Sequence, residues 1–126
     1  MKQNNIVCLL LIIVISCTTR GPILQIDTQD FTAIDTVAAG STAVRQLVLH
    51  NKGDAPLIIE DFLSSCNCTS FDITKGLTIR KGESRIVKIN ITADSSKLKR
   101  LNDIVLTFKT NASPAFYTIE KAFYIE

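Results

Sequence analysis

Residues 84–92 have the sequence Ser-Arg-Ile-Val-Lys-Ile-Asn-Ile-Thr, in which aliphatic and polar side chains alternate. Successive side chains of an extended chain point to opposite faces, so Val87, Ile89 and Ile91 would share one face. The polar residues between them would share the other face. This pattern predicts a β-strand with one buried and one solvated face.

Short segments of the same character lie on both sides of this strand. Predicted strands cover residues 44–51, 57–63, 71–73, 77–79, 104–109 and 116–125, and residues 23–26 and 31–34 form two pieces of a first strand. Gly, Asn, Asp, Ser and Pro are concentrated in the turns between them. About seven short strands without a helix-period segment predict an all-β, immunoglobulin-like β-sandwich over residues 23–126.

The length and composition limit the functional classes. With 126 residues, of which 46% are hydrophobic, the chain has room for one domain whose core needs neither a metal nor a disulfide framework. It has 14 Lys and Arg residues against 12 Asp and Glu residues. Nucleic-acid binders carry a clustered basic face, so this balance predicts no nucleic-acid partner.

The N-terminal residues are typical of a bacterial signal peptide. Lys2 precedes an apolar run over residues 6–15, which is shorter than the roughly 20 residues needed to cross a bilayer. The run ends in Val14-Ile15-Ser16-Cys17, which resembles the lipobox of bacterial lipoproteins. In a lipobox, a small residue precedes a cysteine that is acylated and becomes the new N-terminus.

The lipobox resemblance implies a signal peptide over residues 1–16, lipidation of Cys17 and a short tether over residues 17–22. Two or three acyl chains, at about 0.8 kcal/mol per buried methylene, would hold the protein stably on a membrane. An ordinary secretory signal is the alternative. No acidic run follows Cys17, which favours a periplasm-facing protein of the bacterial cell envelope over a surface-exposed one.

Three further stretches resemble one protein family. Residues 51–57 resemble its Asn-x-Gly-x-x-Pro-Leu hairpin, residues 79–83 resemble its Ile-x-x-Gly-Glu turn, and Ser65-Cys66-Asn67-Cys68-Thr69 resembles its Ser-Cys-Gly-Cys-Thr signature. This is domain-of-unknown-function family fifteen-seventy-three, frequent among Bacteroidota lipoproteins and similar to the immunoglobulin-like domains of pilus chaperones and cilia. The resemblance covers about residues 31–125, and it implies a fold and a location but no reaction.

Cys66 and Cys68 are the cysteines that would remain in the mature domain beside an acylated Cys17. In an extended chain they would lie roughly 6.6 Å apart, so a disulfide between them would need a local bend and would be readily reduced. Three interpretations stay open: a structural pair, a thiol-redox pair, or a copper(I) site with His50 as a third ligand. No cofactor is expected.

The sequence contains no nucleophile elbow, phosphate-binding loop, zinc-protease motif or carboxylate pair at an interpretable spacing, so we expect that the protein is not an enzyme. Asp35-Thr36-Val37 resembles the sequon at which some Bacteroidota attach O-glycans to exported proteins. Thr36 is therefore a candidate glycosylation site, with an exposed threonine at a strand end as the alternative.

These observations predict a lipid-anchored envelope protein that acts as a non-catalytic binding or assembly module. Its partner would be another envelope protein or a glycan, contacted through a sheet edge or through end loops such as residues 66–70 and 97–102. The rival hypothesis is a thiol-redox or copper(I)-handling lipoprotein that uses Cys66 and Cys68.

Overall fold

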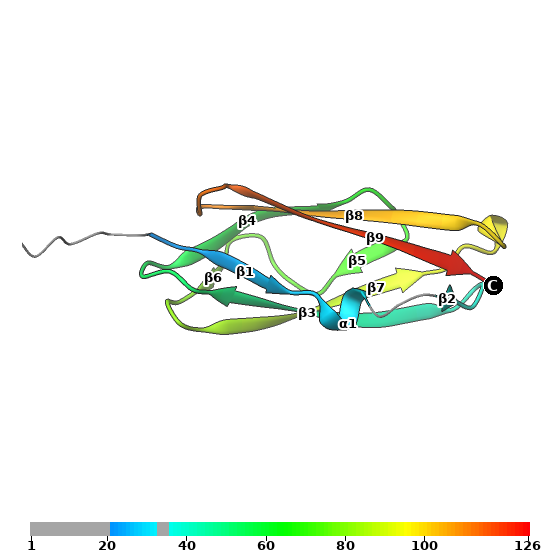
Figure 1. Ribbon diagram of the computed structural model, residues 1–126, viewed down its shortest axis with the longest axis horizontal. Coiled ribbons are helices and arrows are strands. Elements are labelled where there is room, and N and C mark those ends of the chain that lie inside the picture. The colour runs from blue at the N-terminus through cyan, green and yellow to red at the C-terminus, as the bar shows by residue number, and fades with distance from the viewer. Residues whose placement is uncertain (1–20, 33–35) are drawn as a thin grey trace, which may run out of the picture.

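The computed structural model describes residues 21–32 and 36–126, which form two β-sheets packed face to face (Figure 1). The elements are β1 (Leu24–Asp27), α1 (Gln29–Thr32), β2 (Thr36–Val37), β3 (Thr42–Asn51), β4 (Leu57–Ser64), β5 (Thr69–Phe71), β6 (Leu77–Ile79), β7 (Ser84–Thr92), the 3-10 helix η1 (Ser95–Lys97), β8 (Leu101–Thr110) and β9 (Phe116–Ile125). One sheet has the order β1-β3-β7-β5, and the other has the order β2-β9-β8-β4-β6. The predicted all-β sandwich is confirmed, and residues 21–32 and 36–126 form nine strands rather than about seven, because short strands complete the sheet edges.

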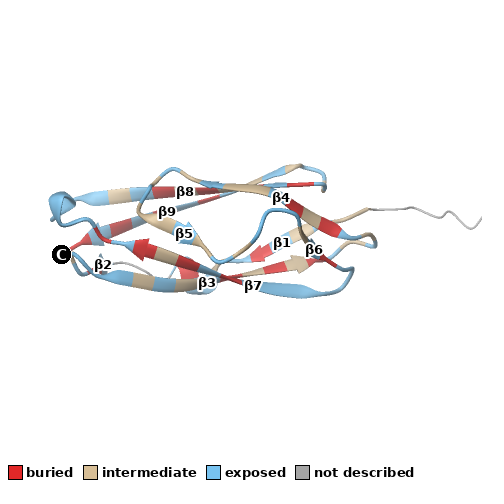
Figure 2. Ribbon diagram, turned by 180° about the vertical axis from the view of Figure 1, so that it is seen from behind, coloured by how far each residue is buried: buried red, intermediate tan, exposed pale blue. Residues whose placement is uncertain are grey.

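The core lies between the sheets and follows the alternation that the sequence predicts. Val87, Ile89 and Ile91 of β7 are fully buried and belong to one core cluster with Leu106 of β8 and Ile119 of β9. Figure 2 shows buried and exposed residues alternating along these strands. Each fully buried aliphatic side chain contributes about 1.5–3 kcal/mol, so this layer supplies the main favourable term in folding.

The predicted second piece of the first strand, residues 31–34, is wrong at Phe31 and Thr32, and its remaining residues lie outside the described part of the chain. The chain instead forms the single helical turn α1, whose Phe31 is fully buried. The carboxylate of Asp27, at the end of β1, accepts a hydrogen bond from the Gln29 amide at 3.0 Å and so favours a helical turn. Neither α1 nor η1, the helices of the described residues, is long and apolar enough to cross a membrane.

The strands run along the long axis of the molecule, so the sandwich has two ends (Figure 1). We call the end where the described chain begins, at Gly21, the near end; it contains the turns at residues 51–56, 80–83 and 111–115. The other, the far end, contains residues 65–68 and 93–100. At a rise of about 3.3 Å per residue, a ten-residue strand such as β3 spans about 30 Å between the two ends.

The near end is organised by one buried side-chain amide. Asn51 is fully buried, and its Nδ2 donates to the carbonyl oxygens of Ala55 at 2.7 Å and Ile79 at 3.0 Å. Its Oδ1 accepts from the Gly53 amide at 3.0 Å. These bonds join β3, the following turn and the end of β6, and they satisfy an amide that would be costly to bury without partners.

Gly53 lets the incoming chain pack directly against this turn. A Cβ atom there would overlap the Gly21 carbonyl oxygen and would lie 2.6 Å from the Ile23 nitrogen. The Lys52 amide donates to the Ile23 carbonyl oxygen at 2.9 Å, and the Asp54 amide donates to the Gly21 carbonyl oxygen at 3.1 Å. The position at which the chain enters the sandwich is therefore fixed by backbone contacts.

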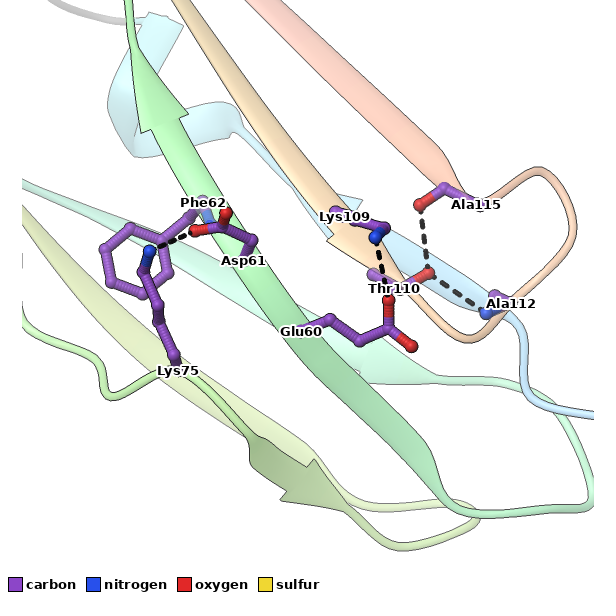
Figure 3. A network of polar contacts seen from close by, with 8 residues as sticks. All are labelled: Glu60, Asp61, Phe62, Lys75, Lys109, Thr110, Ala112 and Ala115. Atoms are coloured by element: carbon purple, nitrogen blue, oxygen red, sulfur yellow. Dashed lines mark hydrogen bonds and ion pairs between the residues drawn. The ribbon is translucent and has the colours of Figure 1, made fainter.

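Polar contacts also join β4 to its neighbours on the outer face of the five-stranded sheet (Figure 3). The consecutive acidic residues Glu60 and Asp61 lie at a register shift between Ile59 and Asp61. Asp61 pairs with Lys75 at 2.7 Å, and Glu60 lies 3.7 Å from Lys109. The hydrogen bond from Lys75, followed by that from the backbone amide after Asp61, holds the pKa of the Asp61 carboxyl below its usual value.

Candidate functional site

A cleft of about 910 Å³ opens between the two sheets at the far end. It is lined by Gly40, by residues 65–68, by residues 92–95 with Lys97, by residues 102–103, and by Phe123 with Ile125. Ligand sites in proteins commonly have volumes of about 300–1,000 Å³. The cleft is therefore large enough for a small molecule or for a loop of a partner protein.

One wall of the cleft carries a disulfide between Cys66 and Cys68. Their Cα atoms are 5.1 Å apart, closer than the roughly 6.6 Å of an extended chain. The required bend is a turn in which the Thr69 amide donates to the Cys66 carbonyl oxygen at 3.2 Å. This turn carries the chain from β4 in one sheet to β5 in the other.

Backbone hydrogen bonds fix both ends of this turn. The Ser65 amide donates to the Val105 carbonyl oxygen at 3.0 Å, and the Val105 amide donates to Ser65 Oγ at 2.9 Å. At the other end, the Thr92 amide donates to the Cys68 carbonyl oxygen at 2.8 Å. Residues 65–68 are thus attached to both sheets by bonds that do not involve the sulfur atoms.

Asp94 also lines the cleft, and it caps η1. Its carboxylate accepts the Ser96 amide at 2.9 Å, as expected for an N-cap. This bond, a second from the Ser96 hydroxyl and the nearby charge of Lys97 lower the pKa of Asp94. Together with Asp103 and Lys97, the ionised Asp94 gives the cleft charges of both signs, and the buried Phe123 lines it as well.

A family model described as protein of unknown function (DUF1573) matches residues 24–122. The chain belongs to the DUF1573 family. The matched region includes Asn51 at the near end and both Cys66 and Cys68 at the cleft, which are residues of the motifs that carry the resemblance. No curated protein sequence matches the chain.

Solved structures share the fold of this DUF1573 chain at low identity. A protein of unknown function from Porphyromonas gingivalis is 13% identical, with a TM-score of 0.64 over 84% of this chain and 48% of that chain. The secreted serine protease VesC from Vibrio cholerae is 10% identical, with a TM-score of 0.53 over 84% of this chain and 23% of that chain. A family 123 glycoside hydrolase from Clostridium perfringens is 13% identical, with a TM-score of 0.56 over 83% of this chain and 27% of that chain.

These likenesses show the fold alone, because identities of 10% to 13% carry no information about a site. The DUF1573 chain spans less than half the length of each of these three structures.

His50, the third residue of the hypothetical copper(I) site, lies far from the cysteines. It is the partner of Gln25 in β1 and of Ser84 in β7, and its Nδ1 contacts the Ser84 hydroxyl at the near end. Thr42, eight residues earlier in β3, pairs with the cleft residue Thr92, so about 26 Å of strand separates His50 from the cleft. Within residues 21–32 and 36–126, no group of three or more His, Cys, Asp or Glu side chains could hold a metal ion.

The remaining candidate residues are placed as follows. Thr36 is exposed at the start of β2, where it pairs with Tyr124, but Asp35 of its sequon lies outside the described residues. Cys17, the predicted lipidation site, also lies outside the described residues, as do the signal peptide and the first part of the tether. Lys97 and Asn102, the first and last residues of the predicted loop at residues 97–102, both line the cleft.

The free sheet edges are protected in the part of the chain that the structure describes. β1, β2, β5 and β6 form these edges and have only two to four residues each. In β9, Tyr124 and Ile125 pair with β2, and the preceding part of the strand does not. In that part, Lys121 points inward, and its ammonium group donates to the Thr32 carbonyl oxygen at 2.6 Å. Short edge strands and an inward-pointing lysine both oppose strand addition, so the end loops are the more accessible surface.

Two of the loops that form the cleft are among the surfaces predicted from the sequence, whereas several other lining residues are not. Asp94 had a detectable signal, because an aspartate followed by two serines is typical of a helix N-cap. Gly40 and Asp103 have no such signal, since contacts with distant residues bring them to the cleft: the Gly40 amide donates to the Ala93 carbonyl oxygen, and Asp103 pairs with Ala122 of β9. Phe123 resembles an ordinary core residue in sequence. It is buried in the core, and it also borders the cleft.

Proposed function

We propose that this DUF1573 chain is a lipid-anchored protein of the bacterial cell envelope and that it acts as a non-catalytic binding or assembly module. The cleft at the far end is the proposed binding surface. The observation that carries this proposal is the position of the cleft, which opens among loops at the end opposite Gly21. Binding sites are commonly built from loops on a rigid scaffold of this kind.

The proposed anchor orients the domain. Residues 18–20 separate Cys17 from Gly21, and a chain of this length spans at most about 14 Å. Gly21 is held against the turn at residues 51–54. Acylation of Cys17 would therefore keep the near end at the membrane surface and direct the cleft away from it.

The chemistry of the cleft and its rim supports a polypeptide partner. The lining offers hydroxyl and amide groups and charges of both signs. Next to the cleft, Leu98 is 47% exposed and Leu101, the first residue of β8, is 70% exposed, beside the exposed Lys99 and Arg100. Apolar side chains surrounded by charged ones are typical of protein interfaces, so we propose an envelope protein rather than a glycan as the partner.

Site-specific photo-crosslinking in intact cells tests the location of the binding surface. A photoreactive residue at the exposed, cleft-lining Asn67 should give a discrete crosslinked product with an envelope protein. The matched position is the exposed Arg80 in the turn before β7 at the near end, which should give none. Lys97→Glu should remove the Asn67 product. Equal crosslinking at both positions, or a product that survives Lys97→Glu, would refute this location.

The anchor has its own test. Cys17→Ser should move the protein from the membrane fraction to the soluble fraction and remove incorporation of a labelled fatty acid. An unchanged fractionation, or continued labelling, would contradict lipidation at this residue.

A further inference from the structure

The Cys66–Cys68 disulfide adds little to the architecture of the domain. It joins residues separated by two positions, so it closes a minimal loop and removes little freedom from the unfolded chain. The turn that it spans is already attached to β8 through Ser65 and to β7 through Thr92. The bond therefore does not hold the two sheets together, and another role must account for a covalent link at this position.

The disulfide is accessible. Cys66 and Cys68 are partly buried, they pack at the margin of the core, and both line the cleft. Accessible disulfides are more often labile or catalytic than those sealed in a core. A substrate that enters the cleft would reach the sulfur atoms without unfolding of either sheet.

The surroundings of the two sulfur atoms differ. The Cys68 backbone amide donates to Cys66 Sγ at 3.2 Å, whereas Cys68 Sγ lies 3.6 Å from the Thr69 hydroxyl. A backbone amide is always a donor, while a hydroxyl either donates or accepts. Hydrogen bonds to the charged form favour it, so Cys66 is better stabilised as a thiolate and is the better leaving group.

We infer that the Cys66–Cys68 disulfide is a thiol–disulfide exchange centre that oxidises the dithiol of a client protein at the cleft. A client thiolate attacks Cys68 Sγ, the Cys66–Cys68 bond breaks, and its electron pair departs on the Cys66 thiolate. The positive charge of Lys97, which lines the same cleft, attracts the incoming thiolate. The product of this step is a mixed disulfide between the client and Cys68.

A second client thiolate then attacks the client sulfur of the mixed disulfide and releases the Cys68 thiolate. The client gains one disulfide, the domain gains two thiols, and two electrons pass from client to domain. Another disulfide-bearing protein of the envelope reoxidises Cys66 and Cys68 by the same exchange in reverse. This reaction adds a catalytic activity to the proposed binding role, so it goes beyond a purely non-catalytic module, and it does not depend on that binding role.

The test uses the full-length protein in detergent with a reduced peptide that contains two cysteines. At neutral pH the peptide should become oxidised one to one, while the protein gains two alkylation sites relative to the Cys66→Ser, Cys68→Ser double variant. The far-UV circular dichroism spectrum should not change. If the pair reacts only after denaturant is added, or if its reduction unfolds the sandwich, the exchange centre is refuted.

Two single variants test the direction of attack. Cys68→Ser keeps the backbone amide that faces Cys66 Sγ, so its remaining thiol should react with iodoacetamide severalfold faster at neutral pH than that of Cys66→Ser. Equal rates or the reverse order would overturn the assignment of Cys66 as the leaving group. Lys97→Glu should slow the exchange with the peptide severalfold without lowering the melting temperature, and an unchanged rate would remove Lys97 from the mechanism.

Discussion

The two ends of the sandwich are closed by different means. At the near end, Asn51 is fully buried and joined to the turn and to β6 by hydrogen bonds, and Gly53 allows the incoming chain to pack without a gap. At the far end, a cleft opens between the sheets, and a disulfide and several charged groups line it. Stability at the near end thus comes from a buried polar network, while the far end keeps reactive and ionised groups accessible.

Asn51→Ala should lower the free energy of unfolding more than substitution of Gly53 or Gly40 or removal of the disulfide. It leaves the carbonyl oxygens of Ala55 and Ile79 and the Gly53 amide without their partner. At about 1–3 kcal/mol for each buried group left unsatisfied, partly offset by relaxation, we expect a loss of about 3 kcal/mol. Urea unfolding followed by circular dichroism measures it.

The matched control for Asn51→Ala is Asn90→Ala on the outer face of β7. Asn90 makes one side-chain hydrogen bond, to Ser70 at 3.3 Å, at an exposed site. Its replacement should cost less than about 0.5 kcal/mol, as for most surface substitutions. Similar losses for the two variants would show that the buried amide does not organise the near end.

Gly53→Ala should have the next largest effect, about 2 kcal/mol, because the new methyl group overlaps backbone atoms of Gly21 and Ile23. Gly40→Ala at the far end is the comparison. It has no atom within 4 Å of the added Cβ but keeps a φ of +73°, which costs about 1 kcal/mol. Thermal melting should rank Gly53→Ala below Gly40→Ala, and the opposite order would contradict tight packing at the near end.

Removal of the disulfide should cost less than removal of the Asn51 amide. The chain-entropy relation gives about 1.5 kcal/mol for so short a loop, and backbone bonds hold the turn in either case. Urea unfolding of the Cys66→Ser, Cys68→Ser double variant checks this value. A loss larger than that of Asn51→Ala would make the far end the more strongly stabilised of the two.

The smallest effect is the response to acid. Hydrogen bonds and lysine charges lower the pKa of Asp61 and Asp94 in the folded state below the ordinary value of 3.8. Because its pKa is lower in the folded state than in the unfolded state, each ionised carboxyl stabilises the folded protein. This contribution is complete above about pH 4 and is lost as the pH falls through the folded-state pKa. Both carboxyls are exposed, so the change is small.

Asp61→Asn and Asp94→Asn should each flatten the acid side of the stability profile, which chemical unfolding between pH 2 and pH 5 measures. Asp94→Asn should also leave the hydrogen bonds of the near end unaffected, since Asp94 caps η1 at the cleft. An unchanged profile in both variants would assign the acid response to other carboxyls.

The strands and their inward faces could be predicted from the sequence because each depends on neighbours along the chain. The alternation of residues 84–92 corresponds to the burial of Val87, Ile89 and Ile91 in β7. The wrong prediction of a strand at Phe31 also arises from reliance on neighbours along the chain. A short helical turn and a short strand can both bury one aromatic side chain. The hydrogen bond that the Asp27 carboxylate accepts from the Gln29 amide favours the helical turn.

The candidate site could be predicted only in part. Cys66 and Cys68 lie two positions apart in the chain, so a bond between them is one of the outcomes that the sequence allows. His50 is the chain's one imidazole and hence the natural third ligand of a copper(I) site, but β3 carries it to the near end.

The sequence by itself therefore determined the strand periodicity, the turns, the family motifs and the cysteine pair, all of which depend on residues within a few positions of one another. The tertiary structure alone decided that Gly40, Asp94, Asp103 and Phe123 meet the cysteines around one cleft. Such contacts join residues far apart in the chain, and they depend on the register and packing of whole sheets rather than on local pattern.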